Sequence, residues 1–166
     1  RRERRLNFRF EYLPGMLFES IVYGVILFFI LNQVTAFNIQ IGLNGKANIV
    51  QGIILIFGAG VYEELLFRVG LVSGIALFLI GILNWNKNSG YILAVIVSAI
   101  IFSLFHYIGE FGDIFTMKSF LSRALAGVLL SVLYVVRGFG IAVYAHIFYD
   151  LIIIFSLLNH PGAGNV

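Results

Sequence analysis

The stretch NIVQGIILIFGAGVYEELLFR, residues 48–68, decides the fold of this chain. It carries no charged side chain until Glu63, and its length matches the roughly 20 residues that a helix needs to cross the hydrocarbon core of a bilayer. It then ends in three ionisable residues, Glu63, Glu64 and Arg68. The stretch predicts a membrane-spanning α-helix with charge at one end.

Similar apolar stretches recur along the chain, separated by short breaks rich in Gly, Asn and Asp, which favour turns. The predicted segments are 14–35, 48–68, 69–83, 91–108, 119–136 and 140–158. Segment 69–83 is short and holds three glycines, so it either spans the membrane partially or continues the preceding helix. We predict an all-α polytopic membrane bundle of about six transmembrane helices.

The composition supports a membrane protein and excludes several other classes. Hydrophobic residues make up 60% of the chain and charged residues 11%, whereas soluble domains carry about 25% charged residues. A soluble globular domain, a disordered chain and a nucleic-acid binder are therefore excluded, and the lipid bilayer is the expected partner. The chain has no Cys, which excludes disulfides and a cysteine nucleophile.

The positive charge is concentrated at the N-terminus, where residues 1–9 hold five of the eleven Lys and Arg. Because positively charged flanks stay on the cytoplasmic side, we predict a cytoplasmic N-terminus. We divide the chain into a basic juxtamembrane or interfacial segment (1–13), one transmembrane catalytic domain (14–160) and a tail (161–166).

Ionisable side chains inside apolar helices are the informative residues, because burying an Asp or Arg at a helix centre costs about 2.5–3.5 kcal/mol. Glu64 and Arg68 are four residues apart, so they share a helix face and are expected to form an ion pair. Glu63 points about 100° away and has no cation at its own i+4 position. One glutamate is thus neutralised locally, and the other is left for a different task.

Two further segments carry histidines. His106 lies near the end of segment 91–108. His146 and Asp150 lie four apart within 140–158, an arrangement suited to orienting an imidazole or to binding a metal. Each feature alone is also typical of a helix end or of a structural hydrogen bond. Together, acids and histidines from three segments indicate a shared, partly hydrated cavity with the groups of hydrolytic chemistry.

Three motifs occur in order in these segments: EELLFR (63–68) fits EExxxR, FSLFH (102–106) fits FxxxH, and HIFYD (146–150) fits HxxxD/N. Over roughly residues 50–155 the chain resembles the CAAX protease and bacteriocin-processing (CPBP) family of intramembrane proteases. This family includes the type II CAAX prenyl endopeptidases. The resemblance implies an intramembrane endopeptidase that cuts a peptide or prenylated protein, as a CAAX-type or bacterial peptide-processing enzyme.

The resemblance also implies roles for individual residues. Glu63 and His106 would activate the attacking water, while His146 and Asp150 would stabilise the oxyanion or complete a metal site. Glu64 and Arg68 would form the supporting ion pair.

The sequence leaves two points of the chemistry open. Position 150 is Asp, where eukaryotic prenyl endopeptidases have Asn, and an ionised Asp is a poor oxyanion donor. Glu63, His106 and His146 are a candidate Zn²⁺ set, but a metal-free glutamate mechanism uses the same residues.

Other functions stay open at this stage. They are a catalytically inactive immunity or scaffold membrane protein, and a small proton or ion transporter. Rhomboid-type, presenilin-type and HExxH motifs fit worse, because the serine is displaced, the aspartate motifs are out of order and HExxH is absent.

A shared site places a demand on the fold. Counting along the segments puts Glu63 and His106 near one membrane face and His146 toward the other, on the order of 10 Å away. The gap closes if the turn at 137–140 dips into the membrane and lines the site, or if the helices are short and tilted. We predict that it closes, with His146 within about 12 Å of Glu63 or His106.

Overall fold

The computed structural model describes residues 10–35, 49–109 and 112–159, and these residues form helices and short turns without any strand. The all-α prediction is confirmed for this part of the chain. Most of the basic segment (residues 1–9) and the whole tail (161–166) lie outside the described residues. The cytoplasmic N-terminus stays a prediction.

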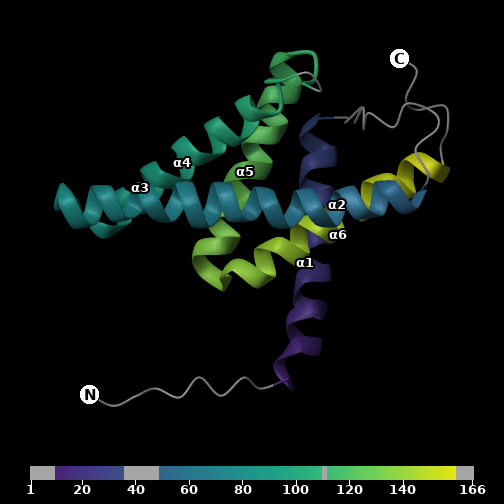
Figure 1. Cartoon of the computed structure of the whole chain (residues 1–166), viewed down its shortest axis with the longest axis horizontal. Coiled ribbons are helices and arrows are strands. Elements are labelled where there is room, and N and C mark those ends of the chain that lie inside the picture. Colours follow the sequence, from purple (N-terminus) through teal and green to yellow (C-terminus); the bar gives the residue numbers. More distant parts are fainter. Residues whose placement is uncertain (1–9, 36–48, 110–111, 160–166) are drawn as a thin grey trace.

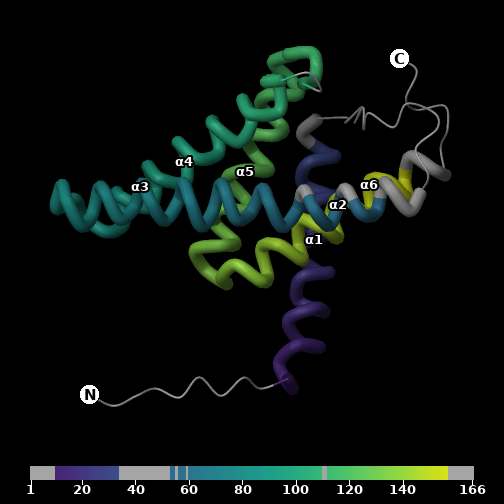
Figure 2. Tube along the Cα trace, in the orientation of Figure 1, coloured from purple at the N-terminus to yellow at the C-terminus, as the bar shows by residue number. Residues whose placement is uncertain are grey.

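The longest helical stretch joins two of the predicted segments, 48–68 and 69–83. It runs through α2 (Ile49–Glu64), η1 (Leu65–Val72), α3 (Ser73–Leu77) and η2 (Phe78–Ile82), and the tube in Figure 2 passes along it without a break. The backbone at Glu64, Val72 and Leu77 stays right-handed helical. Segment 69–83 therefore continues the preceding helix.

The elements η1 and η2 are wider, π-helical turns. In η1 the bond pattern shifts by one residue, so that the N–H of Ser73 donates to the carbonyl of Arg68, five residues earlier. Across the interface with α4, the buried Ser98 hydroxyl donates to the carbonyl of Phe67 at 2.8 Å. A carbonyl within the wide turn thus has a partner on a neighbouring helix.

The remaining helices are α1 (Tyr12–Thr35), α4 (Lys87–Phe105), α5 (Met117–Arg137) and α6 (Phe139–Asn159). Asn86 caps α4 by accepting from the N–H of Asn88, and Thr116 caps α5 by accepting from the N–H of Ser119. Gly138, with φ of +93°, ends α5 and turns the chain into α6.

Five helices in the described ranges are long and apolar enough to cross a membrane: Tyr12–Gln33, Ile56–Ile82, Lys87–Phe105, Met117–Arg137 and Phe139–Ser156. They correspond to the six predicted segments, two of which are fused. Large apolar side chains such as Phe18, Leu77 and Ile92 are exposed on the outside, as a surface facing lipid requires.

The helices cross one another rather than run parallel (Figure 1). The helix that begins with α2 packs across α6, α6 packs against α1, and α4 packs against α5. Because segment 69–83 continues the preceding helix, Glu63 lies inside the span Ile56–Ile82, not near a helix end. The crossing of the helices closes the predicted gap to α6. The turn at 137–140 packs against α1 instead of the site, with Arg137 on Glu19 and Gly140 beside Met16.

Candidate active site

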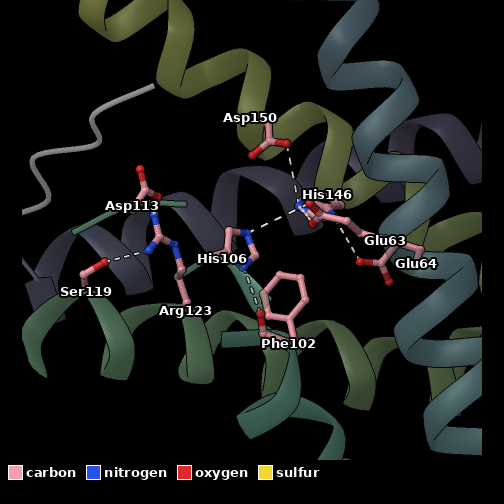
Figure 3. Close-up of polar contacts among 9 residues, drawn as sticks. All are labelled: Glu63, Glu64, Phe102, His106, Asp113, Ser119, Arg123, His146 and Asp150. Carbon is pink, nitrogen blue, oxygen red and sulfur yellow. Dashed lines mark hydrogen bonds and ion pairs between the residues drawn. The ribbon is translucent and has the colours of Figure 1, made fainter. Parts of the chain in front are cut away.

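Glu63 of α2 lies between the two histidines (Figure 3). Its Oε1 is 4.0 Å from Nε2 of His106, and its Oε2 is 3.9 Å from Nε2 of His146. Both distances exceed a hydrogen bond and suit a water molecule between the partners. The Glu63 side chain is one-fifth exposed, so its carboxylate is accessible from outside the core.

The ring of His106 has a defined tautomer. Its Nδ1 lies 2.8 Å from the carbonyl oxygen of Phe102, and because a carbonyl can only accept, Nδ1 carries the hydrogen. The lone pair on Nε2 therefore faces Glu63. His106 lies just past the α4 span, and burial lowers its pKa below the usual value of 6.5, which keeps the ring neutral near pH 7.

His146 of α6 is buried and has carboxylates on both sides of its ring. Its Nδ1 donates to Oε1 of Glu64 at 2.8 Å, and its Nε2 lies 3.6 Å from Oδ2 of Asp150 as well as near Glu63. Asp150 shares the helix face of His146, as the i, i+4 spacing indicates.

Glu64 and Arg68 form an ion pair behind His146, with Nε of Arg68 3.0 Å from Oε2 of Glu64 and both side chains fully buried. The guanidinium carbon of Arg68 lies 4.6 Å from the centre of the Phe102 ring, which favours the cation electrostatically. Its Nη1 and Nη2 have no hydrogen-bond partner among the described protein atoms.

Phe102 packs against three residues of this arrangement. Its ring centre lies 4.9 Å from that of His106 and 6.4 Å from that of His146, each in an edge-on orientation, and Arg68 lies over its face. The motif FSLFH predicts His106 as functional but gives no sign that the phenylalanine ring touches three site residues. No spacing rule could reveal this contact, because it depends on how α4 crosses η1 and α6.

A second polar group lies beside His106 (Figure 3). The N–H of Asp113 donates to the carbonyl of His106 at 2.9 Å, and the Asp113 carboxylate forms an ion pair with Arg123 of α5. Nη1 of Arg123 and the hydroxyl of Tyr107 both donate to the hydroxyl of Ser119, each at 2.9 Å. Asp113 lies in a break between two apolar segments and has no helical spacing to a site residue, so the sequence gives no signal for its contact with His106.

The donor types of Glu63, His106 and His146 suit zinc. Among residues 10–35, 49–109 and 112–159, however, no three His, Asp or Glu side chains are arranged to hold a metal ion. A Zn²⁺ ion at these residues therefore stays a prediction.

The structure brings Glu63, His106, His146 and Asp150 together from α2, the C-terminal end of α4 and α6, with Glu64 and Arg68 behind them. His146 lies well within the 12 Å that the sequence required. The geometry therefore provides one cluster of carboxylates and imidazoles inside a membrane-type helical bundle.

The model of the family described as type II CAAX prenyl endopeptidase Rce1-like matches residues 45–152, which include every residue of this cluster. No curated protein matches the chain, and no solved structure does.

Proposed function

Because this chain belongs to the type II CAAX prenyl endopeptidase Rce1-like family, we propose that it is an intramembrane endopeptidase in which Glu63 and His106 activate the attacking water. The proteins of this family are membrane proteases. The roles of single residues and the nature of the substrate are part of the proposal.

One observation carries the assignment of the water. The Oε1 of Glu63 and Nε2 of His106 face each other at 4.0 Å, and the tautomer of His106 makes both atoms acceptors. Two acceptors facing each other call for a donor with two hydrogens between them, and water is such a donor. A water held in this way points its oxygen lone pairs at an incoming carbonyl.

The proposed reaction proceeds in two steps. The water oxygen bonds to the peptide carbonyl carbon while one water proton passes to Glu63, giving a tetrahedral intermediate. Glu63 then returns that proton to the amide nitrogen, the C–N bond breaks, and an amine and a carboxylic acid leave. Glu63 is thus the general base and then the general acid.

His146 is the proposed donor to the oxyanion. Its Nδ1–H is committed to Glu64, so Nε2 can donate only in the imidazolium form. Three carboxylates, from Glu63, Glu64 and Asp150, face this ring, which balances its charge. Asp150 lies 3.6 Å from Nε2 and helps to balance the charge of the imidazolium, a role for which a carboxylate is better suited than the amide of the eukaryotic enzymes.

The proposed substrate is a peptide or protein whose scissile bond reaches the site from the membrane. A prenylated C-terminal CAAX segment and a bacterial peptide precursor are the two classes to test. A zinc requirement would show as stoichiometric zinc in the purified protein by elemental analysis, with activity lost on chelation and restored by zinc.

The test is cleavage of a peptide library, including prenylated C-terminal peptides, by protein reconstituted in liposomes. Glu63→Gln, His106→Ala and His146→Ala should each lower kcat/KM by at least about 10²-fold. Glu19→Gln is the matched control, because it removes a carboxylate that pairs with Arg137, outside the site.

Unchanged turnover in all three variants would contradict the proposal. Biological activity that persists in all three variants without any cleavage would favour the scaffold or immunity function, for which the Asp at position 150 is the supporting observation. Ion flux that is lost in the same variants would favour transport.

A further inference from the structure

His106 differs from the other site residues in how its position is fixed. Glu63, Glu64 and His146 lie within continuous helices, whose backbone hydrogen bonds hold them on both sides. His106 follows Phe105, the last residue of α4, and the chain then turns through Gly109 at φ +99°. A residue at a helix end lacks hydrogen bonds to a following turn of helix. Its position must be supported from elsewhere.

That support comes from α5 through residues on both sides of the turn. The carbonyl of His106 accepts from the N–H of Asp113, whose carboxylate pairs with Arg123. The next residue, Tyr107, donates to Ser119, and the guanidinium of Arg123 lies 5.2 Å from the centre of the Tyr107 ring. Arg123 also donates to Ser119. We name Tyr107, Asp113, Ser119 and Arg123 the His106 clamp.

Stability alone is a weak reason for this arrangement. The Arg123 side chain is 18% exposed and that of Asp113 is 36% exposed, and partly exposed ion pairs contribute little to stability. The clamp instead joins the histidine backbone to the first turns of a neighbouring helix. Arg123 is also close enough to interact electrostatically with both Glu63 and His106.

We propose that Arg123 and Asp113 are positioning residues that hold His106 with its Nε2 toward Glu63. This inference rests on the proposed function, because a fixed Nε2 matters only if it holds the attacking water together with Glu63. Displacing a catalytic group by about 1 Å can cost on the order of 10²-fold in rate. The clamp should therefore affect the chemical step more than substrate binding.

The chain offers a matched control on the same helix. Arg137, at the other end of α5, forms an ion pair with Glu19, with Nε and Nη2 at 2.5 and 2.6 Å from its two oxygens. This pair has no described contact with the site residues. Arg137→Gln therefore removes the same kind of interaction from α5 without touching the clamp.

The first measurement is kcat and KM in reconstituted protein. Arg123→Gln and Asp113→Asn should lower kcat about tenfold or more with KM within about twofold, and Arg137→Gln should leave both unchanged. Arg123→Lys keeps a positive charge for Asp113, but an ammonium group cannot pair with Asp113 and donate to Ser119 in the way the two guanidinium nitrogens do. Its kcat should therefore lie between those of Arg123→Gln and the wild type. An equal kcat in Arg123→Gln and Arg137→Gln overturns the inference.

The second measurement does not depend on activity. In protein labelled with ¹⁵N-histidine, the signals of His106 are those lost in His106→Gln. Wild type, Arg137→Gln and Arg123→Gln should all show protonated Nδ1, because it donates to Phe102. The Nε2 signal should match wild type in Arg137→Gln and should shift and broaden in Arg123→Gln, as the ring leaves its fixed position toward Glu63. An altered signal in a protein that cuts no peptide would support the clamp while the proposed function fails. An unchanged signal and unchanged kcat in an active, folded Arg123→Gln would reject the clamp alone.

Discussion

The Glu64–Arg68 and Glu19–Arg137 ion pairs use the same two residue types in opposite settings. Glu64 and Arg68 are one helical turn apart and fully buried, whereas Glu19 and Arg137 join α1 to α5 and are partly exposed. Burying charges costs far more than leaving them at a surface, so a buried pair requires a reason beyond its own attraction. In this chain the buried pair has a second role, because Glu64 also accepts a hydrogen bond from His146. The buried pair belongs to the site, and the exposed pair only connects helices.

The largest expected effect comes from Arg68→Met. This change leaves Glu64 as a buried charge without its cation, which should cost about 3–5 kcal/mol of folding stability. Thermal unfolding in detergent, followed by size-exclusion chromatography, measures the loss. The double variant Glu64→Gln/Arg68→Met removes both charges and should recover much of it. A single variant as stable as the double variant would contradict this account of the buried pair.

Glu64→Gln should lower both activity and stability. Like Arg68→Met, it leaves a buried charge without its partner, in this case the Arg68 guanidinium. The amide keeps the shape of the side chain but weakens the charge-assisted hydrogen bond that holds Nδ1 of His146. We expect kcat/KM to fall by about 10–10²-fold, on the scale of a misplaced catalytic group. Peptide cleavage in liposomes measures it, with Glu19→Gln as the comparison. Equal activities of these two variants would erase the distinction between the pairs.

Lowering the pH should reduce kcat/KM of the wild-type protein, in which both ion pairs are intact. Burial lowers the pKa of His106 below 6.5, so the ring stays neutral at pH 7 and becomes protonated only at lower pH. Protonation removes the acceptor on Nε2, so kcat/KM should stay constant near pH 7 and fall as the pH drops through the lowered pKa, by up to about tenfold per pH unit. A pH profile whose activity instead rises on acidification would contradict a neutral His106.

The smallest effect is expected for Glu19→Gln and Arg137→Gln. Both side chains are partly exposed, so each variant should keep wild-type kcat/KM and shift the unfolding midpoint only slightly. The same cleavage and unfolding assays measure both quantities. A loss of activity comparable to that of Glu64→Gln would show that the α1–α5 connection also shapes the site.

The sequence predicts well what depends on helical spacing. Long apolar runs predict membrane-type helices, and four-residue spacing predicts the Glu64–Arg68 pair and the shared face of His146 and Asp150. Segment 48–68 was harder, because Arg68 followed by Gly70 looks like the end of a span. In the structure Arg68 is neutralised by Glu64 and covered by Phe102, so the helix continues through it.

Contacts between distant segments could not be predicted in the same way. Asp113 and Arg123 face each other across the α4–α5 turn, and Glu19 and Arg137 are 118 positions apart. Many acids and bases in a chain could pair, and only the crossing of the helices selects these. The edge-on packing of Phe102 against both histidines depends on the same crossing.

The wide turn η1 has a consequence for changes in chain length. A π-helical turn accommodates one more residue than an α-helical turn, so losing one residue between Val69 and Val72 would tighten η1 while α2 and α3 kept their faces. A one-residue deletion near Gly127 would instead rotate part of α5 by about 100° relative to the rest. We therefore expect a one-residue deletion to be tolerated in η1, next to Glu64 and Arg68, and to be poorly tolerated in α5.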